Sequence, residues 1–285
     1  METVHLPACL PTNPFIRAFQ INLGRVIKAF DHKSVDAIEA GQLPAHLSFR
    51  ERALVAAVVH EHRRTGTLEA LAPLHSWFWK SEEAATYHER GKDLLKGVWL
   101  QHQAAIAEPI RVLVDAIASP FHTLVEIGCG SGFALADLAT RLPRLQSLTG
   151  LDMCATEIEI DRKRNTDPRL RFEAADANVW IPENATPGTI FLTVGGVFEY
   201  FPQKSLETLF TYIANQLKPA AIAMIEPLAD DYDLMSEVAS RTYGNENSLG
   251  HNYPTLLRRA GFVICYQQEH RLNDTRFLSV VGKHM

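Results

Sequence analysis

The residues best placed to do chemistry form a glycine-rich stretch, LVEIGCGSGF, at residues 124–133. Gly128, Gly130 and Gly132 stand at every second position, and the acid Glu126 precedes them inside an apolar run. Glycine lets the backbone approach a ligand closely and adopt conformations that other residues avoid. A dinucleotide loop would read G-x-G-x-x-G, and a P-loop would add Lys and Ser or Thr, so neither pattern matches. The spacing predicts a ligand-binding loop of another kind.

Two aspartates follow the next two apolar runs of the chain. Asp152 ends the run LTGLD, and Asp176 follows the run FEAA. Ligands of open parallel sheets bind beyond the carboxyl ends of the strands. A carboxylate at the first of these ends can accept both hydroxyls of a ribose, and one at the second can meet an adenine amino group. Together with the glycines, the two acids indicate a ligand that contains adenosine.

The elements that must position these residues follow Pro120. Short apolar runs predict seven strands, at 123–127, 147–151, 169–174, 189–194, 220–226, 262–268 and 276–281. Helical segments separate the earlier strands, so this α/β pattern predicts a mostly parallel sheet with helices on both faces. Residues 269–275 are too few for a helix. The last two strands should therefore form an antiparallel hairpin at or near the sheet edge.

The chain before this region is predicted to be helical. Pro14 follows Thr12 and Asn13 and suits a first helical turn, and Ser48 with Glu51 has capping-box spacing.

A long helix is expected over residues 81–118, interrupted at Gly91, Gly97 and Pro109. We divide the chain into an N-terminal helical domain, residues 1–80, and a ligand-binding domain, residues 81–285, that includes this leading helix. The helical domain is expected to serve as a lid or in dimerisation.

Composition limits the class of protein. The chain has 285 residues, 46% of them hydrophobic, and a formal net charge of −5, which argues against a large non-specific nucleic-acid surface. The four cysteines, at 9, 129, 154 and 265, are scattered without a CxxC pair, so free thiols in a reducing compartment are expected. The N-terminus lacks a signal-peptide pattern, and no apolar run approaches the length of a membrane span. These features predict a cytoplasmic protein without membrane association.

From about residue 85 to residue 285 the sequence resembles class I S-adenosylmethionine (SAM) dependent methyltransferases of the small-molecule type. The resemblance implies a seven-stranded Rossmann-like sheet, SAM as cofactor and S-adenosylhomocysteine as product. It also implies that Glu126 orients the loop and the amino end of the cofactor, and that Asp152 binds the ribose. The other implied cofactor residues are Gly128, Cys129, Gly130, Gly132, Met153 on the adenine face, Asp176 and Ala177 at the adenine edge, Val194, Gly195 and Tyr87. A nicotinamide enzyme is the minor alternative.

The acceptor should lie over the end of the fourth strand, TIFLTVGGVFEYFP. This segment lacks the Asn/Asp-Pro-Pro-Tyr signature of amine and amide methylators and the Pro-Cys pair of cytosine C5 enzymes. It also lacks the Asp of metal-dependent catechol-type enzymes, so no metal site is expected. The remaining GGVFEYF resembles small-molecule methyltransferases, in which Gly195 and Gly196 would let the acceptor approach the backbone. Glu199 and Tyr200 are candidate catalytic residues that could face the pocket or be structural.

A histidine and an aromatic cluster complete the candidate residues. His251, in the segment GHNYPTLLRRAGF, is the leading candidate for a general base, although a capping or surface histidine would look the same. The segment 75–91 concentrates aromatic residues, usually a sign of core packing. In related enzymes the helix before the first strand covers the cofactor, so Tyr87 or Trp79 could contact it.

These features predict a methyltransferase that transfers a methyl group from SAM to an O or N atom of a small molecule, such as a secondary metabolite, without a metal. Other chemistry on the same fold, such as cyclisation or aminopropyl transfer, is an alternative. So is a non-catalytic SAM-binding interaction subunit. A protein or RNA acceptor is a further alternative, although the acidic net charge disfavours nucleic acid. A homodimer is also considered.

Overall fold

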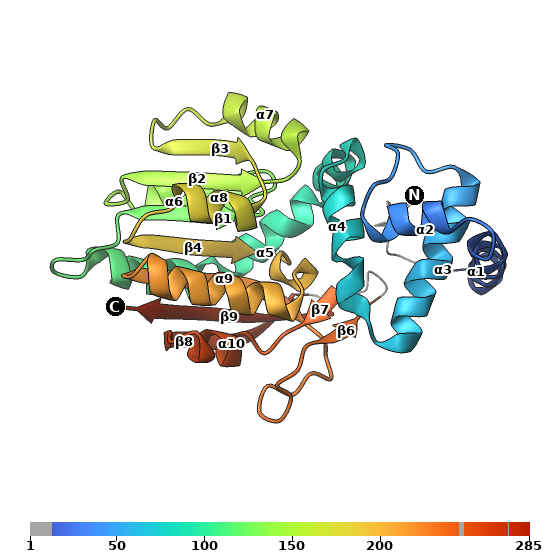
Figure 1. The fold of residues 1–285 in the computed structure, drawn as a ribbon. Helices are drawn as coiled ribbons and strands as arrows, with labels where there is room; N and C mark the ends of the chain where they lie inside the picture. Colours follow the sequence, from blue (N-terminus) through green and yellow to red (C-terminus); the bar gives the residue numbers. More distant parts are fainter. Residues whose placement is uncertain (1–12, 245–247, 273) are drawn as a thin grey trace. The chain divides into compact units, whose positions relative to one another are not determined.

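The computed structural model describes residues 13–244, 248–272 and 274–285 (Figure 1). The chain forms two compact units, and each has its own hydrophobic core. The first unit runs to Tyr87 and includes residues 242–249, whereas the second unit holds the remainder. Cys9 and Thr12, which entered the sequence analysis, lie outside the described residues.

The first unit is helical. It contains α1 (Pro14–Lys28), α2 (His32–Glu39), α3 (Phe49–Thr65), the 3₁₀ turn η1 (Leu68–Leu71), α4 (Ala72–Trp79) and the start of α5 (Glu82–Asp115). The short strands β6 (Arg241–Tyr243) and β7 (Ser248–Gly250) pair with each other. The predicted caps are confirmed, because Asn13 accepts amide hydrogen bonds at the start of α1 and Ser48 forms a capping box with Glu51.

The second unit is built on a seven-stranded sheet. Its strands are β1 (Thr123–Ile127), β2 (Ser147–Asp152), β3 (Leu170–Ala174), β4 (Thr189–Val194), β5 (Ala220–Leu228), β8 (Val263–Leu272) and β9 (Thr275–His284). The spatial order is β3-β2-β1-β4-β5-β9-β8. The first five strands are parallel, and β9 runs antiparallel between β5 and β8. The predicted sheet and its C-terminal antiparallel hairpin are confirmed.

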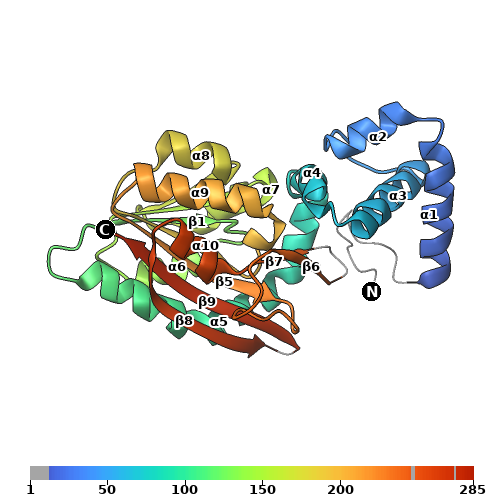
Figure 2. The same cartoon turned by 60° about the horizontal axis from the view of Figure 1, so that its bottom comes forward.

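Helices cover both faces of this sheet, as Figure 2 shows for α5 and α6 on one side and α8 and α9 on the other. One core joins the sheet to α5, α6 (Phe133–Arg141) and α7 (Ala155–Arg164). The other core joins it to α8 (Ala177–Asn184), α9 (Gln203–Gln216) and α10 (Tyr253–Arg259). Because the central strands are buried on both faces, they read as continuous apolar runs. Their carboxyl ends lie at one edge of the sheet, where a ligand is expected.

The predicted interruptions of the long helix are wrong. Helix α5 is continuous through Gly91 and Gly97, and Pro109 lies inside it. A glycine in a helix costs only about 1 kcal/mol, and an internal proline about 3 kcal/mol. The buried residues Trp99 and Ile110 of this helix belong to the core of the second unit, and burial of such side chains offsets those costs.

The division between the two units falls within this helix, between Tyr87 and His88. Segment 242–249 returns to the first unit from a position late in the chain. None of the described helices is long and apolar enough to cross a membrane. Cys129 and Cys154 are buried free thiols, and Cys265 is an exposed one.

Candidate functional site

The glycine loop connects β1 to α6 at the carboxyl edge of the sheet. Gly128, Gly130 and Gly132 all have positive φ angles, of 67°, 48° and 62°. A Cβ on Gly128 would lie 2.6 Å from Cγ2 of Val197, and one on Gly132 would lie 2.7 Å from the ring of Phe172. Both the backbone conformation and the close neighbours therefore require glycine here.

Glu126 lies beneath this loop as a buried acid in β1. Its carboxyl group accepts a hydrogen bond from the backbone amide of Leu135, in the first turn of α6. Its Oε2 atom has no hydrogen-bond partner among the described residues. Burial raises the pKa of Glu126 well above its usual value, and the charges of Asp161 and Asp152 raise it further. An oxygen in this position can receive a cationic donor from a ligand.

Asp152 ends β2 beside the loop and is almost fully buried. Its Oδ2 accepts from the backbone amide of Gly130, and its Oδ1 accepts from that of Cys154, each at 2.9 Å. The backbone amide of Cys129 in turn bonds the carbonyl of Leu151 at 2.9 Å. The loop is thus fixed to the end of β2. Burial alone would raise the pKa of Asp152, but its hydrogen-bonding partners and a nearby histidine lower it.

That histidine is His88 of α5, which the sequence analysis did not assign to the site. Its Nε2 lies 3.7 Å from Oδ1 of Asp152, and the side chain is 8% exposed. Its Nδ1 lies 3.4 Å from the position of a Cβ on Gly130. The sequence offered one signal, because His88 lies four residues after the apolar Ala84 and so on the same face of the helix.

Two further acids escaped notice on α7. Glu157 and Asp161 are one turn apart on this helix and both are buried. Oδ2 of Asp161 would lie 3.1 Å from a Cβ on Gly132, and Arg164 pairs with its Oδ1 while donating to the carbonyl of Ser131. Burial and the charge of Glu157 raise the pKa of Asp161 to about 7. The available signal was their spacing, since Glu157 and Asp161 are four residues apart and so lie on one face of the helix.

Asp176 and Ala177 begin α8, at the carboxyl end of β3. Asp176 is the N-cap residue, and its Oδ1 accepts from the amide of Asn178 at 2.9 Å. Ala177 is buried, and Met153, after β2, is half-buried. All three lie at strand ends on the same edge of the sheet as the glycine loop. Their contacts with an adenine ring stay predictions.

The segment after β4 is held by a buried acid that the sequence analysis missed. Glu226 of β5 is fully buried, and its Oε2 accepts from the amides of Val197 at 3.0 Å and Phe198 at 3.1 Å. Burial raises the pKa of this carboxyl group to about 7, against the opposing effect of these hydrogen bonds. An acid inside an otherwise apolar strand was the signal.

Val194 and Gly195 lie at the start of this segment, and Glu199 and Tyr200 lie in the short 3₁₀ helix η2 (Phe198–Tyr200). The amide of Gly195 bonds the carbonyl of Ile225 at 2.8 Å. Glu199 is nearly buried, and its Oε1 lies 2.4 Å from the position of a Cβ on Gly196. The φ angle of 105° at residue 196 favours a glycine there. Contact of Glu199 or Tyr200 with an acceptor stays a prediction.

His251 is fully buried. Its Nδ1 is hydrogen-bonded to the hydroxyl of Ser240, which also donates to Oε1 of Gln203. Its ring packs against Tyr253 with centroids 5.3 Å apart. Burial lowers the pKa of His251 to about 4, so it is neutral and weakly basic at neutral pH. The buried hydrogen bond and ring contact indicate that His251 stabilises this segment. Its role as a general base stays a prediction.

Tyr87, the last residue of the first unit, packs edge-on against Trp79 with ring centroids 5.3 Å apart, and against Phe78 at 6.2 Å. This explains the aromatic cluster as packing within the helical unit. Contact of Tyr87 or Trp79 with a cofactor stays a prediction.

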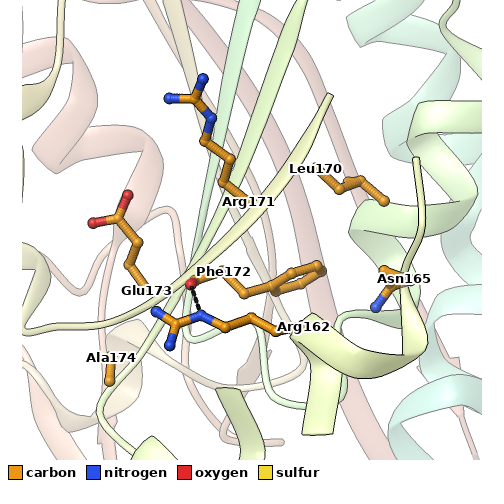
Figure 3. A pocket seen from close by; sticks show the side chains of 7 residues that line it. All are labelled: Arg162, Asn165, Leu170, Arg171, Phe172, Glu173 and Ala174. Carbon is orange, nitrogen blue, oxygen red and sulfur yellow. Dashed lines mark hydrogen bonds between the residues drawn. The ribbon is translucent and has the colours of Figure 1, made fainter. Parts of the chain in front are cut away.

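A pocket of about 580 Å³ lies along the outer edge of β3 (Figure 3). It is lined by residues 170–174 of the strand region together with Arg162 and Asn165, and Arg162 donates from Nε to the carbonyl of Phe172. None of the predicted site residues lines it. Within the described residues no group of three or more His, Cys, Asp or Glu side chains could hold a metal ion.

Comparison with known proteins agrees with this geometry. Residues 124–220 match the family model described as a methyltransferase domain. The region contains the glycine loop, Asp152, Asp176 and the segment after β4. This part of the chain therefore matches a methyltransferase domain.

Two relatives match part of the sequence. Trans-aconitate 2-methyltransferase of Methylobacterium radiotolerans is 34% identical over 120 residues, which are 41% of this chain and 43% of that protein. The uncharacterized protein RP028 of Rickettsia prowazekii is 27% identical over 103 residues, or 36% of this chain and 41% of that protein. The matches span only about two fifths of the length of these relatives.

One solved structure extends the similarity at the level of the fold. It is a chain of the complex between the Haloferax volcanii Trm112 methyltransferase activator and a protein described as a methyltransferase. The TM-score is 0.50 with 19% identity, over 70% of this chain and 96% of that chain. This similarity includes more of the present chain than the methyltransferase-domain match does.

The site residues of the methyltransferase domain fit SAM. The buried, unpartnered Oε2 of Glu126 suits the cofactor's ammonium group, the glycine loop admits a closely packed ligand, and Asp152 presents an ionised carboxylate for the ribose. When bound, SAM supplies an activated methyl group on a sulfonium sulfur, so the protein's task is to bind and orient.

Proposed function

We propose that this protein is a SAM-dependent methyltransferase that acts on an O or N atom of a small-molecule acceptor without a metal. The observation that carries the proposal is the convergence of Glu126, the glycine loop and Asp152 at one edge of the sheet. The chain's own residues would bind the cofactor and exclude water, because methyl transfer needs close approach and alignment more than proton chemistry.

Each predicted residue has a role in this proposal. Glu126 receives the ammonium group, and Asp152 receives the ribose hydroxyls. Met153 packs on the adenine, while Asp176 and the amide of Ala177 recognise its edge. The remaining cofactor contacts are the loop residues Gly128, Cys129, Gly130 and Gly132, with Val194 and Gly195 after β4 and Tyr87 from the helical unit.

The acceptor would lie beside η2, with Glu199 and Tyr200 as its candidate contacts. Because the buried His251 is a weak base, an acceptor that is already ionised suits the site best, since its oxygen attacks without losing a proton. A carboxylate has this property, and the trans-aconitate 2-methyltransferase match supports testing small organic acids first. An acceptor that must first lose a proton, such as an alcohol or a protonated amine, would require His251 or another group to act as a general base.

Calorimetric titration with S-adenosylhomocysteine, SAM and NAD tests the cofactor. We expect the two sulfur compounds to bind, NAD not to bind, and Asp152→Ala to weaken binding at least tenfold by removing the ribose acceptor. Asp115→Ala is the matched control, since Asp115 is exposed at the end of α5. At 100 times its dissociation constant, a ligand should also add about 2.7 kcal/mol of stability. Absence of binding by both sulfur compounds contradicts the proposal.

Product analysis with methyl-labelled SAM then tests the reaction. Transfer of label to an organic acid or to another small molecule supports methyl transfer. Cyclisation or aminopropyl transfer leaves the acceptor without labelled methyl. Cofactor binding with no turnover of any acceptor, together with stoichiometric capture of a partner protein, indicates an interaction subunit instead.

We further propose that the protein acts in the cytoplasm and that its helical unit serves in homodimerisation or as a lid. Exposed apolar side chains on α1, including Phe15 and Phe19, support the role in homodimerisation.

A further inference from the structure

The imidazole of His88 contacts two parts of the proposed cofactor site at once. Its Nε2 lies 3.7 Å from Oδ1 of Asp152, and its Nδ1 faces Gly130, at 3.4 Å from the position of a Cβ there. Both side chains of the His88–Asp152 pair are more than nine-tenths buried. The imidazole therefore lies against the carboxylate assigned to the ribose and against the loop assigned to the cofactor.

The carboxylate of Asp152 has a limited number of acceptor positions. A carboxylate offers about four lone-pair directions. The amides of Gly130 and Cys154 take one on each oxygen. Two directions are left for the two ribose hydroxyls, and His88 approaches the oxygen that Cys154 already bonds. A ribose hydroxyl and the imidazole of His88 would thus compete for the remaining acceptor position on Oδ1 of Asp152.

The surroundings of His88 favour its cationic form. Burial by itself lowers the pKa of His88, but the hydrogen bond and charge of Asp152 raise it, and the charges of Glu157 and Asp161 on α7 raise it further. The net result is a pKa above the usual value of this side chain. Arg164 on α7 pairs with Asp161. His88 therefore keeps its proton to a higher pH than an ordinary histidine does.

Two other titratable groups face Asp152, and neither replaces His88 as its counter-ion. The carboxyl group of Glu126 in β1 and the thiol of Cys129 in the loop both have raised pKa values, chiefly because of burial. Both effects favour the uncharged forms of these groups.

We propose that His88 competes with the cofactor's ribose for the Asp152 carboxylate, so that cofactor binding releases a proton from this site. The inference rests on the proposed SAM site. His88 is a positioning residue here: it holds Asp152 in an ion pair, which a ribose hydroxyl must displace. Once displaced, the imidazole loses the partner that favoured its proton.

The direction of the pH effect follows. Below the pKa of His88 the ion pair opposes binding, and above it the imidazole is neutral and yields the carboxylate more readily. Affinity for S-adenosylhomocysteine should therefore rise with pH. Over each pH unit in which one proton is fully linked to binding, the dissociation constant falls about tenfold.

The experiment is calorimetric titration of the full chain with S-adenosylhomocysteine across this pH range. Repeating it near pH 6.5 in buffers of different ionisation enthalpy counts the protons released. We expect the wild type to release a measurable fraction of one proton. His88→Gln should release fewer protons than the wild type, depend less steeply on pH, and bind more tightly than the wild type near pH 6. His88→Asn provides a second neutral side chain if the first variant folds poorly.

His284→Gln is the matched control, because His284 ends β9, at the opposite edge of the sheet from the glycine loop. It should keep the wild-type pH dependence. A pH-independent wild type, an affinity that falls as pH rises, or a His88→Gln variant that keeps the full slope would each overturn the role of His88. In those cases binding weakened by Asp152→Ala still supports the proposed function. Failure of S-adenosylhomocysteine to bind at any pH overturns both.

Discussion

At the scale of single residues, the glycine loop is surrounded by carboxyl groups whose pKa values move in opposite directions. Asp152 has a lowered pKa because two backbone amides and His88 bond it, which overcomes the effect of burial. Glu126 and Asp161 have raised pKa values because burial and neighbouring acids dominate. The site therefore keeps Asp152, the acid proposed to bind the ribose, ionised while it holds the others closer to neutral. Such separation of pKa values is typical of functional sites.

Asp161 gives this pattern a testable consequence for stability. Its pKa is about 7 in the folded protein and about 3.9 when unfolded, so the folded state binds more protons between these values. Its contribution to stability is therefore present at acid pH and is lost as the pH rises toward 7. Asp161→Asn should flatten the decline of unfolding free energy between about pH 4 and pH 7, by on the order of 2–4 kcal/mol. Denaturant unfolding at several pH values measures this.

Glu159→Gln is the control for that experiment, because Glu159 lies on the exposed face of the same helix. It should leave the pH profile unchanged. A profile for Asp161→Asn that is parallel to that of the wild type contradicts the raised pKa.

At the scale of elements, the segment that follows β4 is fixed from β5. Glu226 bonds two successive amides at the start of η2, where the backbone turns away from the sheet. Such an arrangement gives an irregular segment the hydrogen bonds that a strand would have supplied. Glu226 thus positions the segment on which the candidate acceptor contacts Glu199 and Tyr200 lie.

Glu226→Gln tests this attachment. The substitution keeps one acceptor oxygen for the amides of Val197 and Phe198 but removes the negative charge that strengthens these hydrogen bonds. We expect hydrogen exchange at these two amides to accelerate at least tenfold above about pH 7.5, where the wild-type carboxyl group is ionised. Exchange within β1 should not change. Glu183→Gln, at an exposed acid of α8, is the matched control, and unchanged exchange at Val197 and Phe198 would remove the proposed role.

At the scale of the whole molecule, the chain forms two units with separate cores. The second unit holds all of the predicted site residues except Tyr87. The helical unit presents large apolar side chains to solvent within the described chain, among them Phe15 at 84% and Phe19 at 60% exposure. Phe19 and Phe49 lie with their rings 6.3 Å apart and form part of this surface.

Phe19→Asp tests whether this surface makes a homodimer. If it does, light scattering coupled to size exclusion should give twice the chain mass of 31.9 kDa for the wild type and a single chain mass for the variant. A charge placed in an apolar interface loses hydration without a partner, which costs several kcal/mol. Val263→Asp is the control, since Val263 is an exposed apolar residue on β8 of the other unit. A wild type that is monomeric at all concentrations contradicts dimerisation.

The sequence by itself determined the sheet and the cofactor side of the site, since both depend on local signals. Strands β1 and β4 begin and end at the predicted residues, because each is a short apolar run bounded by polar or glycine residues. The glycine loop, Asp152 and Asp176 were predictable because strand ends in a parallel sheet meet at one edge. The continuity of α5 was not predictable, since glycine and proline weaken a helix locally. Only the tertiary structure shows that burial of Trp99 and Ile110 in the core offsets this loss of helix stability.

Only the tertiary structure decided which distant side chains meet. His88 and Asp152 are far apart in the sequence, as are Glu226 and Val197, and no local pattern pairs them. The same holds for the burial of His251, which lowers its pKa and so changes the chemistry it can offer. Spacing within an element reports which residues share a face. Charge, proton affinity and access depend on packing between elements, because burial and neighbouring charges set them.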